Sequence, residues 1–367
     1  MKGRREKTGA RVEVDARSKR KVRQVTDHPS IHHHPFFFVP AFDRAGTKLF
    51  FVSHRTGKPQ VYYEDRAAGE IVQVTDRDDL AEWSVYPSPD GRRVYFTAGT
   101  GAWCVDLQDL SETRLADFGA VEMREKGMVG AAMGTTALSA DGRWWAIPVK
   151  AGKVSRFIVI DTGTGASQVI LERDTIGHPQ FCPDDDNFIL YAGPLTDRVW
   201  TVARDGSNNR RVYSREDRMQ WVTHEVWLPG RKAIAFIDWP RGMRLIDIET
   251  GESETRLAHW LNQFPAWHAA PDAAGQRFVC DTNFPDKGLH IIPLDGDPQF
   301  LCASGASSEG AHWAHPFPYN DGPVAVEARQ HTHPHPRFAP DGRSVVFTSD
   351  KSGFAQVYEV ELEGGPA

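Results

Sequence analysis

The sequence has few cysteines and no long apolar run. Its 367 residues include four cysteines, which lie far apart and form no Cys-x-x-Cys pair: Cys104, Cys182, Cys280 and Cys302. This spacing excludes a disulfide framework and a thiolate zinc site, so we expect four core thiols. No apolar stretch approaches the roughly 18 residues of a membrane span, and the N-terminus lacks the apolar centre of a signal peptide. We therefore expect a cytoplasmic protein without a membrane partner.

The sequence also lacks a strong excess of either charge. The formal net charge is −6, and basic and acidic residues are mixed along most of the chain. This balance predicts no nucleic-acid partner. The basic run from Lys2 to Arg5, continuing at 17–23, lies in a polar N-terminal segment that we interpret as solvated, and we assign it no function.

No sizeable helical periodicity is present, but the chain repeats itself. Each repeat places a Pro/Asp/Gly turn before an alternating apolar run, as in Ser88–Gly91 followed by RRVYFTA and Ala339–Gly342 followed by RSVVFTS. Related turns bring the total to seven, at Asp43–Gly46, Ala140–Gly142, Pro183–Asn187, Pro229–Lys232 and Pro271–Gln276. A repeat of about 40 to 50 residues is typical of a β-propeller.

These repeats predict an all-β, seven-bladed β-propeller with four-stranded blades. We expect one domain at 12–363, after a polar leader at 1–11 and before a tail at 364–367. The last repeat is longer, which predicts an insertion loop at about 303–328 over one face. Val12–Thr26 should supply the outer strand of the last blade and close the ring.

Histidines gather at matching places in the repeats. Several of the fifteen precede a turn, where a blade's innermost strand begins: His33, His34, His178, His224, His268, His333 and His335. Their matching positions should bring them to the same end of the central channel. Buried imidazoles without a ligand, a metal or a hydrogen-bond partner would be costly there.

The strongest local motif runs from Gln330 to Pro336 and reads QHTHPHP. Its two prolines enforce an extended backbone, so the side chains of His333 and His335 point the same way and can bind one ion. A proline-stiffened turn with exposed histidines is the structural alternative. His268, at the equivalent site of the preceding blade, favours the metal.

Three stretches carry a resemblance to a known family: Gly177-His178-Pro179, Thr223-His224-Glu225-Val226-Trp227 and Gln330 through Pro340. In this order and on propeller repeats, they resemble the oligogalacturonate lyases of polysaccharide lyase family 22. The similarity covers nearly the whole chain but is dense only at these motifs.

The resemblance implies a seven-bladed propeller whose manganese ion is held by His268, Gln330, His333 and His335. It also implies His224 as the catalytic base and Arg198 as the catalytic arginine. Imidazole and amide ligands suit several divalent metals, so zinc, iron, cobalt and nickel stay open.

Two departures from the family concern the substrate. The family's first blade begins with His-Arg-Asn and an aromatic residue, whereas this chain has His33-His34-Pro35-Phe36. The third blade lacks a long aromatic and charged insertion and passes directly from Ile147 to Phe157. These differences predict a divergent member, for which a related uronide is an alternative substrate.

The residues suit a β-elimination. Removing the C5 proton of a uronate moves charge onto the C6 carboxylate, and a nearby cation stabilises that charge. Three neutral imidazoles and one amide would leave a bound ion its full charge. His224 suits the base because the charge of Arg198 and of the metal disfavours its protonated form. The structural alternatives are a hydrogen-bonded His224 within its blade and a surface ion pair for Arg198.

Further side chains are candidates for substrate binding. They are His178, His33, His34 and Trp221, with Trp267 and Trp313 as further aromatic residues that flank the motifs. Each has a structural alternative. His178 would support the start of its blade, His33 and His34 would belong to a local turn, and the tryptophans would pack within the blades.

The resulting hypothesis is a metal-dependent lyase that cleaves short oligogalacturonides or related oligouronides. Its partner would be a small acidic oligosaccharide, and its products unsaturated uronates. The alternative is a non-catalytic propeller that serves as a binding platform, like periplasmic propellers of similar repeat type. A metal-dependent hydrolase is a third hypothesis, with less support because the motif strands carry no paired carboxylates. The sequence leaves the oligomeric state open.

Overall fold

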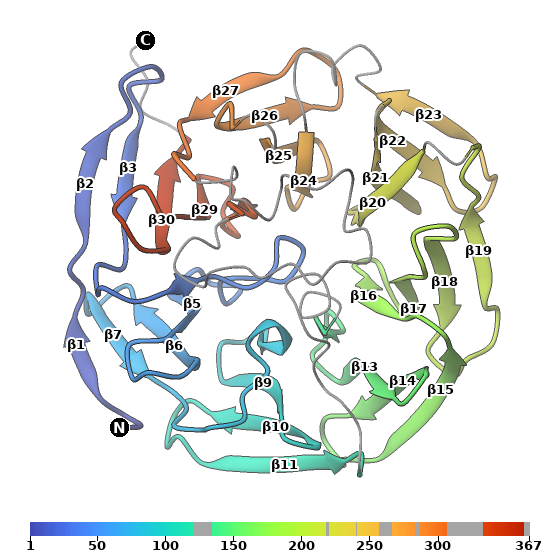
Figure 1. Ribbon diagram of the computed structural model, residues 1–367, viewed down its shortest axis with the longest axis horizontal. Coiled ribbons are helices and arrows are strands. Elements are labelled where there is room, and N and C mark those ends of the chain that lie inside the picture. Colours follow the sequence, from blue (N-terminus) through green and yellow to red (C-terminus); the bar gives the residue numbers. More distant parts are fainter. Residues whose placement is uncertain are drawn as a thin grey trace.

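The computed structural model describes residues 1–119, 134–217, 220–239, 241–256, 266–282, 286–306 and 333–362. These residues form seven antiparallel β-sheets arranged in a ring (Figure 1). The predicted seven-bladed propeller is therefore confirmed. Within the described ranges, no helix is long and apolar enough to cross a membrane.

Five blades consist of four consecutive strands, ordered from the centre outward. The second blade contains β8 (Tyr86–Pro87), β9 (Arg93–Ala98), β10 (Gly101–Asp106) and β11 (Glu112–Asp117); the third contains β12 (Ala137–Leu138), β13 (Trp144–Ala151), β14 (Val154–Asp161) and β15 (Ser167–Arg173). The fourth contains β16 (Gly177–Cys182), β17 (Asp185–Ala192), β18 (Val199–Ala203) and β19 (Arg210–Tyr213); the fifth contains β20 (Trp221–Leu228), β21 (Ala233–Trp239), β22 (Gly242–Asp247) and β23 (Ser253–Arg256). The sixth contains β24 (Ala266–Pro271), β25 (Arg277–Thr282), β26 (Leu289–Pro293) and β27 (Gln299–Cys302).

The first and seventh blades also take strands from the N-terminal segment. From the centre outward, the first blade contains β4 (His32–His33), β5 (Lys48–Ser53), β6 (Gln60–Asp65), β7 (Glu70–Gln73) and β1 (Arg5–Lys7). The seventh contains β28 (Arg337–Phe338), β29 (Ser344–Ser349), β30 (Gln356–Glu361), β3 (Lys21–Gln24) and β2 (Arg11–Val14). A short 3₁₀ helix, η1 (Glu82–Ser84), precedes the second blade.

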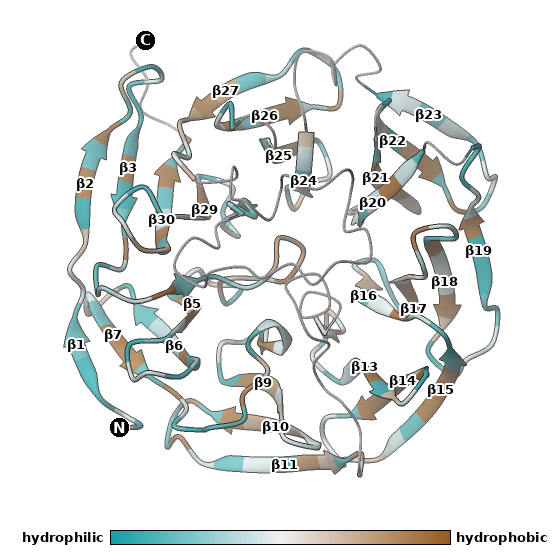
Figure 2. Ribbon diagram, viewed as in Figure 1, coloured by the Kyte–Doolittle hydropathy of each residue, from teal (hydrophilic) through white to brown (hydrophobic). Residues whose placement is uncertain are grey.

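The middle strands of each blade are apolar on both faces because each blade packs against two neighbours. In β5, Phe50 and Val52 pack with the second blade, whereas Leu49 and Phe51 pack with the seventh. Figure 2 shows the consequence, since the inner and middle strands are largely hydrophobic and outer strands such as β2 and β11 are more hydrophilic. The four cysteines are free and buried in this core.

Strand β3 closes the ring by pairing with β30, antiparallel. The expected closing segment, Val12–Thr26, thus lies where the repeat pattern places it, and β2 adds a further strand outside β3. Arg23 on β3 donates two hydrogen bonds to Glu64 of the first blade, at 2.5 and 2.8 Å, and two to Glu359 of the seventh, at 2.8 and 3.3 Å. This arginine ties the last blade to the first.

The first eleven residues contribute to the propeller rather than only preceding it. The polar segment Arg5–Lys7 forms β1 and pairs with β7 at the outer edge of the first blade. The expected leader at 1–11 therefore needs correction, because backbone hydrogen bonds hold a strand whose side chains carry no apolar pattern. Of the expected insertion at 303–328, only 303–306 falls within the described residues.

The Asp-Gly turns depend on glycine for two separate reasons. Gly91 has φ +67° and Gly46 has φ +66°, a left-handed conformation that costs other residues about 1–2 kcal/mol. A Cβ on Gly91 would lie 2.7 Å from Oδ2 of Asp43 on the neighbouring blade, whereas a Cβ on Gly46 would meet nothing within 4 Å. Asp43 cannot move freely because it accepts hydrogen bonds from Thr47 Oγ1 at 2.6 Å and Lys48 N at 2.9 Å.

Gly91→Ala should therefore destabilise the propeller more than Gly46→Ala does. We expect Gly46→Ala to lower the free energy of unfolding by about 1 kcal/mol and Gly91→Ala by about 2–3 kcal/mol, because only the second adds a clash to the backbone strain. Urea denaturation of the two variants measures both values. Equal losses of the free energy of unfolding would show that Asp43 can move away from the added Cβ of residue 91 without destabilising the protein.

Candidate active site

The innermost strands of three consecutive blades are interrupted at a histidine. Their pairing with the next strand shifts register at 177–180 in β16, at 223–226 in β20 and at 266–269 in β24, and each range contains one histidine. His178 and His224 also adopt positive φ, at +48° and +55°. Such strain persists only where the surrounding structure enforces it, and it is common at functional sites. The shifts redirect these side chains relative to a regular strand.

Three histidines converge at the centre of the ring. One ring nitrogen from each of His268, His333 and His335 lies within 4.8 Å of the others. The ring centroids of His268 and His335 are 4.2 Å apart, and those of His268 and His333 are 5.2 Å apart. The structure thus brings together the pair and the third histidine that the sequence singled out. Gln330, the fourth expected ligand, lies outside the described residues.

Asp281 on β25 fixes the orientation of His268. Its carboxylate accepts hydrogen bonds from the His268 backbone N–H at 2.7 Å, from Nδ1 of His268 at 2.8 Å and from the backbone N–H of His335 at 3.2 Å. With its proton on Nδ1, His268 presents the lone pair of Nε2 to a cation. Burial raises the pKa of Asp281 to about 8, against the effect of the backbone N–H groups of His268 and His335, and it is the ionised form that accepts the Nδ1 proton of His268.

Sequence analysis did not identify Asp281. The only sign of it in the sequence is a lone carboxylate near the end of the apolar strand RFVCDT. That strand is β25, which pairs with the strand β24 that carries His268.

His224 lies beside this three-histidine centre. Its ring centroid is 4.2 Å from that of His268 and 4.8 Å from the Trp267 ring. Its Nδ1 atom is buried and has no hydrogen-bond partner among the described residues. Burial, followed by the proximity of His268 and His178, keeps the pKa of His224 well below its usual value. A neutral imidazole with an unengaged ring nitrogen can accept a proton. The structural alternative is that His224 only forms hydrogen bonds within its blade. Its Nδ1 forms none with the described residues.

Arg198 is buried beside two partners rather than exposed. It precedes β18, and only 7% of its surface is accessible. Its Nε donates to Glu225 Oε2 at 3.3 Å, and its Nη2 donates to His178 Nδ1 at 3.0 Å. Because a guanidinium can only donate, His178 accepts through Nδ1 and carries its proton on Nε2. The structural alternative of a surface ion pair for Arg198 is therefore wrong.

Glu225 compensates this buried arginine. The side chain is fully buried; burial alone would raise its pKa, but the charge of Arg198 lowers it to about 2. The backbone carbonyl of Glu225 also accepts a hydrogen bond from Gln180 Nε2 at 2.7 Å. Glu225 was visible in the THE motif, but its role became apparent only from its contact with the neighbouring blade.

Three phenylalanines from the loop between β4 and β5 fill the centre of the ring next to these side chains. The Phe36 ring centroid lies 4.6 Å from His335 and 5.2 Å from His178. Phe37 lies 5.1 Å from His268 and 5.7 Å from His224. In Figure 1 this blue loop reaches the middle of the ring. The aromatic rings give the site an apolar wall.

The two first-blade histidines differ in their surroundings. His34 is buried and its Nε2 donates to the backbone carbonyl of Pro334 at 3.1 Å, so it supports the segment before His335. His33 stacks on Trp83 at 4.3 Å and borders a cavity of about 70 Å³ that His333 and His335 also line. Only His33 of this pair lines that cavity.

The expected aromatic residues pack against one another. The Trp221 and Trp267 rings lie 4.9 Å apart, nearly edge to face, and both are buried. For Trp221, this contact supports the packing role rather than the stacking of a sugar on its ring. Trp267 also contacts the His224 ring. Trp313 falls outside the described residues.

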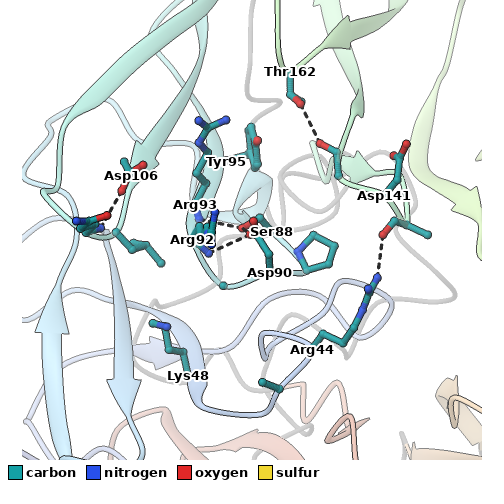
Figure 3. A pocket seen from close by; sticks show the side chains of 17 residues that line it. Arg44, Lys48, Ser88, Asp90, Arg92, Arg93, Tyr95, Asp106, Asp141 and Thr162 are labelled. Carbon is teal, nitrogen blue, oxygen red and sulfur yellow. Dashed lines mark hydrogen bonds between the residues drawn. The ribbon is translucent and has the colours of Figure 1, made fainter.

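A wider hollow lies away from the histidines. It has a volume of about 960 Å³ and is lined by the turns of the first three blades, including Arg44, Ser88–Arg93 and Asp141 (Figure 3). These turns follow the innermost strands, whereas the histidines lie toward the beginning of those strands. Acidic and basic side chains are mixed there, and many are held within the turns, as in the 2.6 Å bond from Ser88 Oγ to Asp90. The hollow therefore shows no catalytic grouping.

Comparisons with known proteins show the family of the chain. The family model described as oligogalacturonate lyase matches residues 149–365. The oligogalacturonate lyase of Dickeya dadantii (strain 3937) is 28% identical over 92% of each chain, and the oligogalacturonide lyase of Pectobacterium atrosepticum is 28% identical over 94% of each. A solved oligogalacturonate lyase in complex with manganese has a TM-score of 0.81 and 23% identity over 98% of each chain. Because the family model covers more than half of this sequence, the chain belongs to the oligogalacturonate lyase family, a family of carbon–oxygen lyases.

Proposed function

We propose that the protein cleaves short oligogalacturonides or related oligouronides by metal-dependent β-elimination. The observation that carries this proposal is the convergence of His268, His333 and His335 within 4.8 Å, directly beside His224. In such an arrangement a bound cation would lie next to a candidate base. The curated relatives named above are lyases of oligogalacturonate or oligogalacturonide, which supports this substrate class.

The three histidines suit a divalent transition metal. Asp281 holds His268 in the tautomer that a metal ligand needs, and such carboxylate partners are typical of metal-binding histidines. His268, His333 and His335 would hold the ion, with Gln330 as the proposed fourth ligand. When bound, a divalent ion supplies positive charge that stabilises a uronate carboxylate as negative charge develops on it. Manganese is our proposal because the similar solved structure is a manganese complex.

The chain's own residues perform the proton transfer in this proposal. His224 takes the proton from C5, the electrons of that bond form the C4–C5 double bond, and the C4–O bond breaks. The leaving sugar oxygen takes up one proton, and His224 returns its proton to solvent, so atoms and charge balance. The phenylalanines beside the histidines exclude water and strengthen the electrostatic interactions at the site.

Arg198 acts in this scheme as a positioned donor. Glu225 and His178 engage its Nε and Nη2, while Nη1 has only a long contact of 3.5 Å with the Gly193 carbonyl. Nη1 is thus the least engaged donor and the one we assign to the substrate. Glu225 and His178 act through Arg198 by fixing the plane of its guanidinium.

Replacing both His333 and His335 by alanine should remove one divalent ion per chain. Two of the three imidazoles are then lost, and His268 alone cannot hold the ion. The measurement is elemental analysis of protein purified without a chelator, with His290→Ala in the sixth blade as the control that keeps wild-type metal content. Unchanged metal in the double variant would remove this site from the proposal.

His224→Ala should abolish elimination while the metal content stays at the wild-type level. The variant loses the proton acceptor but none of the three converging imidazoles. Turnover is followed through the ultraviolet absorbance of the conjugated double bond, with oligogalacturonides as substrate and product masses as identification. We expect a loss of about a thousandfold or more. Loss of the ion together with activity would make His224 a ligand instead.

Arg198→Lys should lower kcat/KM by about a hundredfold, equivalent to roughly 2.7 kcal/mol of transition-state stabilisation. Lysine keeps the charge but cannot reach Glu225, His178 and a substrate at once through one planar fork. Arg211→Lys is the matched control, because Arg211 is half exposed and pairs with Asp197 at 3.3 Å. Wild-type kinetics in Arg198→Lys would take Arg198 out of the site.

A further inference from the structure

A second group of ligand-type side chains borders the three-histidine centre. His33 on β4 and His54 just after β5 belong to the first blade, and Glu82 belongs to η1 before the second. One ligand atom from each lies within 4.8 Å of the others. Nε2 of His54 is 2.8 Å from Glu82 Oε2, and Nε2 of His33 is 3.4 Å from the same oxygen.

The orientation of His33 is that of a metal ligand. Its Nδ1 lies 3.1 Å from the backbone carbonyl oxygen of His34, and a carbonyl can only accept, so Nδ1 carries a proton. In the neutral ring, the lone pair of Nε2 then faces a carboxylate oxygen of Glu82. Two electron pairs in this position repel each other unless a second proton on the His33 ring or a metal ion lies between them. Stacking on Trp83, with an interplanar angle of 26°, holds the ring in place.

The separations between these atoms fit a shared ion. Metal ions bind imidazole nitrogen and carboxylate oxygen at about 2.0–2.2 Å, so neighbouring ligands of one ion lie about 2.9–3.4 Å apart. The distance of 3.4 Å from His33 to Glu82 falls within this range, and the distance of 2.8 Å from His54 to Glu82 is about 0.1 Å below it, so a small movement of His54 would admit the ion. Two imidazoles and one carboxylate form a ligand set that several divalent transition metals accept, and it leaves coordination positions open.

The open positions would face the candidate active site. The cavity of about 70 Å³ is lined by His33, His54 and Glu82 together with His333 and His335. It is large enough for water molecules or part of a ligand. None of the three residues is among the ligands assigned above, so this site does not depend on the proposed function.

We propose that His33, His54 and Glu82 bind a second divalent transition-metal ion, across a small cavity from the three-histidine centre. Glu82 contributes one negative charge and the ion carries two positive charges. The occupied site would therefore keep a net positive charge and attract an anionic group. With the proposed function, that group would be a second carboxylate of the oligouronide, because each uronate unit of the substrate carries one.

The test counts ions by equilibrium dialysis of chelator-treated full-length protein against Co²⁺, followed by elemental analysis. We expect two ions per chain in the wild type and one each in Glu82→Gln and His54→Ala. His28→Ala, which removes a histidine of the connection between β3 and β4 that lies outside the cluster, should keep two. Glu82→Gln is nearly isosteric, and thermal melting checks that each variant is folded.

The counts also separate this proposal from the first metal site. The His333→Ala/His335→Ala variant should keep one ion, and adding Glu82→Gln to it should leave none. One ion in the wild type that Glu82→Gln and His54→Ala both retain would overturn the second site and leave the proposed lyase intact. An ion that persists in the triple variant would overturn both assignments.

Discussion

Imidazoles from separate blades meet within 4.8 Å because a closed ring presses each blade against two neighbours. Each blade contributes only one or two of the side chains, and no single sheet contains the site. The distances between them are therefore set by the packing of apolar faces between blades and by the β3 to β30 pairing that closes the ring. Stability and site geometry have the same physical origin in this fold.

Two buried carboxylates, of Asp281 and Glu225, fix the orientation of the side chains at the site. Asp281 connects β25 to both His268 and the backbone of His335, and so links the sixth blade to the seventh. Glu225 does the same for the fourth and fifth blades through Arg198 and His178. Each carboxylate is buried, and each spans a boundary between blades. The site is thus braced at the two places where its side chains come from different sheets.

Much of the fold and part of the site could be predicted from the sequence. The turns recur at a fixed spacing, and the apolar runs between them alternate, so the blade number followed directly. His333 and His335 lie close together on one proline-rich segment, and His268 occupies the matching place one blade earlier. The extended backbone expected for that segment is wrong at His335, whose φ is +48°. Asp281 could not be predicted in the same way, because its contact with His268 depends on the register shift in β24. β1 was missed because its side chains are polar and only its backbone pairs.

Strand β3 pairs with β30, and the hydroxyl of Thr26 reaches Gln356 across 330 positions of the chain. During synthesis, β3 therefore emerges long before its partner β30. The last blade also brings His333 and His335, so neither a complete ring nor a complete histidine centre can form before that blade has been made. Until then, the unpaired edge of β3 and the exposed faces of the terminal blades are open to other chains. Assembly of this centre thus depends on the last blade, even though the earlier blades can fold as they appear.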